Sequence, residues 1–194
     1  MSHPASTTAH AGALPAARAI AVPPGTAIHA TLHGSHFHDA YAVPDHHPDR
    51  PALQAWLDVA TQTPSWIRAL MLVRNKAVRL VGLKDVGQLQ DGYPPASGKP
   101  PNDAASYAVG DRVGIFRIRF LSDREVILGQ DDRHLDVQVS ILRRDEGTDG
   151  PTLVLSTVVH IHNTLGHAYM AVITPFHRVI ARSLTQRMSG HGQR

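Results

Sequence analysis

The sequence contains no cysteine among its 194 residues. This absence excludes disulfides, catalysis by a thiol and metal ligation by thiolates. Because disulfides are rare in reducing compartments, a chain without cysteine fits a cytoplasmic protein, and we expect that localisation.

Long apolar runs and an excess of charge are also missing. No apolar stretch reaches the roughly 18 residues that a membrane-spanning helix needs, and the N-terminus shows neither the basic start nor the apolar core of a secretory signal. The formal net charge of +3 is too small to indicate a nucleic-acid partner, and the few aromatic residues do not alternate with basic ones. We therefore predict no membrane span and no nucleic-acid binding.

Common motifs for cofactor binding and catalysis are absent as well. There is no glycine-rich phosphate loop and no Gly-x-Ser-x-Gly nucleophile elbow. Histidine, in contrast, is abundant, and one group gathers early in the chain at His29, His33, His36, His38, His46 and His47. With Asp39 or Asp45, two or three of these imidazoles could hold zinc or nickel. Their spacing fits no compact metal motif, so we favour a solvated surface and predict neither a metal nor a cofactor.

The composition divides the chain into one domain with loose ends. Residues 1–25 are rich in Ala, Pro, Ser and Thr, and we expect them to lack a fixed structure. We expect a single domain over residues 26–188 and a flexible tail over residues 189–194. Within the domain, residues 86–110 form a long Pro- and Gly-rich loop, either a mobile insertion or a lid.

The first half of the domain indicates one strand and two helices. Weak alternation predicts a strand over residues 26–33, followed by an extended or turn segment to residue 43. Asp49 and Pro51 are start signals for a first helix that carries Leu53, Trp56 and Leu57 on its inner face. A second helix follows from Pro64 to about residue 81.

The second half indicates four strands and a long terminal helix. The strands cover residues 113–121, 125–130, 134–143 and 152–162, and their short connections predict an antiparallel meander. In the third strand, apolar residues alternate with Asp136, Gln138 and Ser140, which is typical of a sheet with one buried and one wet face. The helix, over residues 165–188, shows one apolar stripe: Leu165, Tyr169, Val172, Ile173, Phe176, Val179, Ile180 and Leu184.

These elements predict an α+β helix-grip fold, in which a curved antiparallel sheet wraps around the long C-terminal helix. Pro175 lies inside that helix and should bend it to fit the curved sheet. We expect a cavity between the concave side of the sheet and the helix.

Three segments resemble a known family. They are HNTLGHAYMAVITPFHRVI, WIRALMLVRNKAVRLVGLK and VGIFRIRFLSDREVILGQDDRHLDVQVSILRR. Together they are similar to an uncharacterised bacterial family, the domain of unknown function 2867, over most of residues 37–187. The most specific residues are Asn163, Gly166, Tyr169, Pro175, Phe176 and His177.

The resemblance carries an expectation about fold and a broad class of function. The family is itself similar to the START and polyketide-cyclase (SRPBCC) superfamily, which shares the helix-grip fold. Members of that superfamily bind lipids, hormones or polyketides, and some catalyse cyclisation or hydrolysis. The family has no settled catalytic residues to carry over, and a fold alone does not fix a function.

Our leading functional hypothesis is the binding of a small apolar or amphipathic molecule between sheet and helix. The expected wall residues are Phe116, Ile118, Val137, Val139, Tyr169, Ile173 and Phe176, and the hydroxyl of Tyr169 or the ring of His177 would orient the ligand. A first alternative is a cyclase- or hydrolase-type enzyme with His177 or His134 as general base. A second is a structural or partner-binding module with a filled core. A homodimer stays open.

Other polar residues have simpler interpretations. His160 and His162 share one side of their strand and should face solvent, and Asn163 should cap the terminal helix. Arg117 and Arg119 lie either on a charged outer face, which we favour, or inside the cavity as anchors for an acidic ligand.

Overall fold

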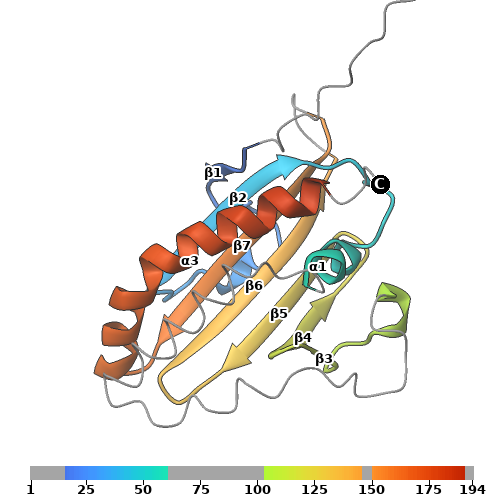
Figure 1. The fold of residues 1–194 in the computed structure, drawn as a ribbon. Coiled ribbons are helices and arrows are strands. Elements are labelled where there is room, and N and C mark those ends of the chain that lie inside the picture. The colour runs from blue at the N-terminus through green and yellow to red at the C-terminus, as the bar shows by residue number, and fades with distance from the viewer. Residues whose placement is uncertain (1–15, 61–102, 146–149, 191–194) are drawn as a thin grey trace, which may run out of the picture.

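The computed structural model describes residues 16–60, 103–145 and 150–190. Seven antiparallel strands form one sheet in the order β1-β2-β7-β6-β5-β4-β3 (Figure 1). In that order the strands are Arg18–Ile20, Phe37–Pro44, Thr152–Ile161, Leu135–Arg144, Glu125–Asp131, Phe116–Leu121 and Arg112–Val113. The helices within the described residues are α1 (Ala52–Ala60) and α3 (Thr164–Gly190), with short 3-10 turns at His29–Thr31 and Ala104–Ser106.

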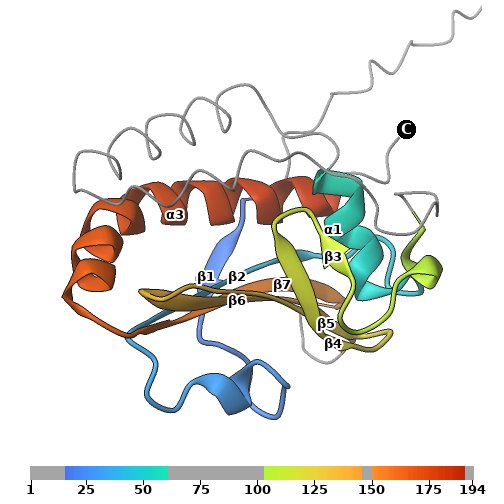
Figure 2. The same cartoon turned by 90° about the horizontal axis from the view of Figure 1, so that it is seen from below.

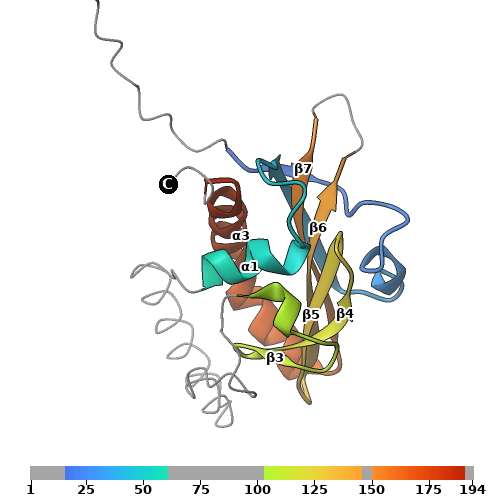
Figure 3. The ribbon, with the colours of Figure 1, turned by 90° about the vertical axis from the view of Figure 1, so that its right-hand side faces the viewer.

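Both helices lie on the same face of the sheet (Figures 2 and 3). α3 packs on β2 and β7, while α1 packs on β5, β6 and α3. The main core lies between this face and the helices and includes Tyr41, Val43, Leu53, Leu57, Leu128, Ile141, Leu153, Leu155, Ala181 and Met188. The expected α+β class, a curved antiparallel sheet with a long C-terminal helix, is confirmed at this level.

The opposite face is not the wet surface that we expected. The chain between β1 and β2 crosses it (Figure 2), and Val22 and Ile28 pack there in a second core. Val154 and Val158 of β7 are fully buried on this side. The prediction was wrong here because β7 carries apolar residues on both faces, whereas our argument rested on the alternation in β6.

The beginning of the domain also differs from the prediction. Residues 29–31 form a 3-10 turn rather than part of a strand, and the strand in this region is β2. Gly25 and Gly34, with φ of 77° and 72°, turn the chain on either side of the 3-10 segment, a backbone that glycine adopts without cost. β1 lies within the segment that we expected to lack fixed structure.

The strand predicted over residues 113–121 is in fact a hairpin. β3 and β4 pair antiparallel, with Val113 opposite Phe116. Gly114 has a φ of 64°, while Ile115 has a negative φ. This two-residue turn fits type II′, which needs glycine first.

The buried face of α3 is only partly the predicted stripe. Val172 and Val179 are 38% and 56% exposed, whereas Met170, Ala181 and Met188 are buried. At the start of the helix, a Cβ on Gly166 would lie 2.3 Å from the carbonyl oxygen of His134. The buried line of α3 therefore does not follow the predicted stripe along its whole length.

We expected Pro175 to bend the long C-terminal helix. The ribbon of α3 bends along its length (Figure 2), Pro175 lies inside it, and Thr174 bonds back to the carbonyl of Met170 at 2.6 Å. Both features bend helices.

The expected second helix and most of the 86–110 loop lie outside the described residues. Among the described helices, none is long and apolar enough to cross a membrane.

Candidate functional site

Strand β2 places an acidic side chain on the face that α3 covers. Phe37, Asp39, Tyr41 and Val43 alternate along the strand, so they share one face. Tyr41 and Val43 belong to the core beneath the helices. Asp39 is therefore an acid at an inward position, where burial is costly unless the charge is paired.

His177 of α3 supplies the partner of Asp39. Its Nε2 lies 3.3 Å from Asp39 Oδ1, and the two side chains are 24% and 13% exposed. Phe37 contacts the imidazole edge-on, with ring centroids 5.5 Å apart. An ionised carboxylate only accepts hydrogen bonds, so Nε2 carries a hydrogen and donates it. In the neutral imidazole, Nδ1 then keeps its lone pair.

One oxygen atom of this pair and one on the neighbouring strand have no hydrogen-bond partner among the described residues. They are Asp39 Oδ2 and Thr157 Oγ1, and both are buried. Thr157 is 1% exposed and stands directly opposite Asp39 on the neighbouring strand. Leaving a buried polar atom unsatisfied costs about 1–3 kcal/mol, so two adjacent cases call for an explanation.

Tyr41 adds a hydroxyl to the same region. Burial raises the pKa of Tyr41 above the ordinary value of 10.0, and the charge of Asp39 and the hydrogen-bonding approach of its side chain to the phenol raise that pKa further. Arg178 and Arg182 on α3 act in the opposite direction. The net shift is upward, so the phenol stays protonated at neutral pH and can donate a hydrogen bond. We define Asp39, Tyr41, Thr157 and His177 as the polar centre.

An apolar row leads away from the polar centre across the sheet. Successive cross-strand pairs join Thr157 to Val139, Val139 to Leu128, and Leu128 to Ile118. Val139, Leu128 and Ile118 are 7%, 0% and 1% exposed. The polar centre therefore stands at one end of a buried apolar floor.

The predicted wall residues fall into two groups. Ile118, Val139, Val137 and Phe116 all pack in the main core, so they share the helix-covered face with the polar centre. Phe116, however, contacts Trp56 of α1 edge-on. Tyr169, Ile173 and Phe176 are half-buried on α3. Of the residues predicted on α3, His177 contacts Asp39.

His134, the other predicted base, belongs to a different cluster at the start of α3. Its Nδ1 lies 3.2 Å from Asn163 Oδ1. Asn163 also accepts from the amide of Gly166 at 3.1 Å, which is the capping role that we expected. Nearby, His162 lies 3.2 Å from Asp136.

His160 and the two strand arginines make surface contacts. His160 Nε2 lies 3.2 Å from the carbonyl of His33. Arg117 donates to the carbonyl of Gly110 at 2.8 Å, and Arg119 pairs with Asp131. Both arginines are exposed, in line with the charged outer face that we favoured. In the described parts of the chain, no group of three or more His, Cys, Asp or Glu is placed to hold a metal.

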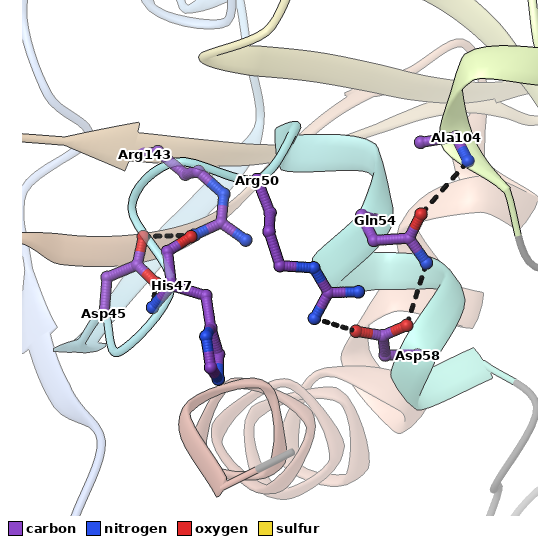
Figure 4. A network of polar contacts seen from close by, with 7 residues as sticks. All are labelled: Asp45, His47, Arg50, Gln54, Asp58, Ala104 and Arg143. Atoms are coloured by element: carbon purple, nitrogen blue, oxygen red, sulfur yellow. Dashed lines mark hydrogen bonds and ion pairs between the residues drawn. The ribbon is translucent and has the colours of Figure 1, made fainter. Parts of the chain in front are cut away.

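A second polar network ties the end of β6 to the connection between β2 and α1 (Figure 4). Arg143 Nη1 donates to Asp45 Oδ2 and to the carbonyl of His47. The Arg143 and Asp45 side chains are only 4% and 6% exposed. Asp45 Oδ1 also accepts from the amide of His47 at 3.0 Å. Because these bonds fix the loop in place, we interpret the pair as structural.

The network continues along α1. Arg50 pairs with Asp58 at 3.0 Å, and Gln54 donates to Asp58 at 2.9 Å. Gln54 also accepts from the amide of Ala104 at 3.1 Å, which attaches the 3-10 turn Ala104–Ser106 to the helix (Figure 4).

Sequence reasoning found His177 but missed Asp39, Thr157 and Tyr41 as its neighbours. We considered Asp39 only as a metal ligand, in a segment that we took for an extended or turn connection. The available signal was an acid between Phe37 and Tyr41 at the inward parity of a strand. Which helix residue reaches that acid depends on a pairing across 138 positions, which no local pattern encodes.

The fold and the site define a class: an α+β domain with a helix-covered antiparallel sheet and a half-buried histidine–carboxylate pair between sheet and helix. The family model described as "Protein of unknown function (DUF2867)" matches residues 31–184. The chain belongs to this family. No curated protein and no solved structure matches it.

Proposed function

We propose that the domain binds a small apolar or amphipathic molecule between the sheet and α3, with the polar centre receiving its polar group. The observation that carries the proposal is the pair of unsatisfied oxygens at Asp39 and Thr157. A ligand that bonded to both would remove their desolvation cost. It would act in a region already excluded from water, where such bonds are strongest.

The apolar part of the ligand would lie against the row that begins at Val139. Burial of apolar area contributes about 25 cal/mol per Å², so contact with this floor would supply affinity while the polar centre sets orientation. In this proposal the half-buried Tyr169, Ile173 and Phe176 complete the wall from α3. The helix-grip relationship to the SRPBCC superfamily and a bacterial cytoplasmic setting belong to the same proposal.

The experiment uses a matched pair of variants on β7. Thr157 and Ser156 are each buried, and the hydroxyl of each lacks a partner in the described structure, but their side chains point to opposite faces. Thr157→Val and Ser156→Ala should both preserve or raise the thermal stability of the ligand-free protein, because each removes an unsatisfied hydroxyl. Only Thr157→Val should reduce the amount of small molecule that native mass spectrometry detects on the purified protein.

Two results would contradict this binding function. One is the absence of any bound small molecule in gently purified protein and after incubation with lipid extracts. The other is equal ligand retention in Thr157→Val, Ser156→Ala and the unsubstituted protein.

A second candidate function is catalysis with His177 as general base. The observation that favours it is the contact of Asp39 with His177 Nε2, which leaves Nδ1 free to accept a proton. The Asp39 carboxylate would then stabilise the imidazolium cation that forms. In that case His177→Gln should abolish turnover of the bound molecule while binding persists. Mass spectrometry of the bound species before and after incubation separates the two outcomes.

A third candidate is a partner-binding module. Val172 and Val179 are exposed on α3 and, seven residues apart, share one face of the helix. Apolar side chains that gather into one exposed patch mark interaction sites. Sedimentation velocity tests a homodimer through this surface, which Val179→Glu should abolish without altering ligand retention.

A further inference from the structure

We infer that the ligand of the polar centre carries a hydrogen-bond donor, a hydroxyl or an ammonium group, at the end of its apolar body. The inference rests on the proposed binding function and specifies its chemical class. It is carried by Asp39 Oδ2 and Thr157 Oγ1, which are buried and without hydrogen-bond partners in the described structure and belong to directly opposite residues of β2 and β7.

The chemistry of these atoms decides between a donor and an acceptor. An ionised carboxylate has lone pairs and no hydrogen to give, and a threonine hydroxyl can accept as well as donate. Asp39 Oδ1 is already occupied by His177, so Oδ2 is the oxygen left for a ligand. A ligand N–H or O–H matches it directly. A ligand carboxylate would place a second negative charge against it, which a buried site amplifies.

The other charged and titratable groups around the site are few. On the sheet, Tyr41 stays protonated because burial raises its pKa. On α3, Arg178 and Arg182 are exposed at the rim, and Arg182 donates to the carbonyl of Ala17 at 3.1 Å. Solvent screens exposed charges, so the half-buried Asp39 and His177 are the groups that select the ligand.

The test compares three probes that share one alkyl chain: n-decylamine, n-decanol and decanoate. Isothermal titration calorimetry at neutral pH should detect binding of the amine and the alcohol. The affinity for decanoate should be lower than either by a factor of about ten or more. Asp39→Asn keeps the shape of the side chain but removes its charge and adds a hydrogen-bond donor. It should lower the affinity for n-decylamine by about tenfold and reduce the preference for the amine over decanoate.

Controls separate recognition from damage to the fold. Thr157→Val should lower the affinity for n-decanol, whereas Thr157→Ser should retain that affinity. Ser156→Ala, on the opposite face, should leave the affinities for all three probes unchanged. Circular dichroism and a cooperative thermal transition establish that each variant is folded.

The outcomes are distinguishable from those of the proposed function. Decanoate binding as tightly as the amine and the alcohol, or an amine affinity unaffected by Asp39→Asn, overturns the donor inference and leaves small-molecule binding intact. Failure of all three probes to bind also overturns the donor inference, and native mass spectrometry of the purified protein then judges the binding function independently.

Discussion

The buried pair of Arg143 and Asp45 offers a sharp test of what holds the β2–α1 connection in place. Asp45→Ala removes the carboxylate but leaves the guanidinium, whose side chain is 4% exposed. Nη1 keeps one acceptor, the carbonyl of His47, and Nε already has none in the described structure. The variant therefore strands a positive charge away from water.

The expected cost is large. Breaking a buried ion pair by removing one partner typically costs about 3–5 kcal/mol, because the other charge stays buried and unpaired. The double variant Arg143→Met with Asp45→Ala should recover much of that loss, since it leaves no charge behind. An exposed pair serves as the control: Arg119 and Asp131 are 43% and 53% exposed, and Asp131→Ala should cost about 0–1 kcal/mol.

Urea unfolding measures all four proteins, with stability taken from the transition midpoint and the m-value. An Asp45→Ala variant within about 1 kcal/mol of Asp131→Ala would refute the reasoning, because the loop would then not depend on the buried charge pair. A double variant less stable than Asp45→Ala would refute the account of the stranded charge, even if the single variant behaved as expected.

Two further predictions concern the opposite face and the polar centre. Glu125→Gln should lower the free energy of unfolding by about 2 kcal/mol, because the Glu125 carboxylate accepts a hydrogen bond from the amide of Ala27 at 2.8 Å and holds the crossing segment on the sheet. Hydrogen exchange should show lost protection at that amide, and unchanged protection would contradict the anchoring role. The raised pKa of Tyr41 means that the folded protein holds the phenol proton after the unfolded chain has lost it. That contribution to stability is complete below the unfolded pKa, about 10, and is lost as the pH rises toward the folded pKa. Tyr41→Phe should flatten this alkaline decline in urea unfolding at about pH 9 and 11, and an identical decline in both proteins would refute the shift.

Much of the fold follows from local pattern, and its failures have local causes. The hairpins of β5, β6 and β7 were predictable because each strand is bounded by turn residues and carries an inward apolar row. β1 is too short to give a signal. Gly114 divided one apparent strand into two because a glycine inside a strand pattern also permits a tight turn. In each case the sequence pattern was real, and its ambiguity concerned the backbone at one or two residues.

The helix stripe failed for a different reason, and that reason bears on function. We assigned the inner face of α3 to its largest apolar residues, yet the buried line carries Met170, Ala181 and Thr185, and His177 reaches the sheet between them. Thr185 satisfies its hydroxyl on the carbonyl of Ala181 at 2.8 Å. Asp39 Oδ2 and Thr157 Oγ1 lack such partners in the described structure. Proteins depart from local consistency mainly where function requires it. Ser156 Oγ on the opposite face is unsatisfied as well. The comparison of Thr157→Val with Ser156→Ala therefore distinguishes a binding site at the polar centre from a packing defect.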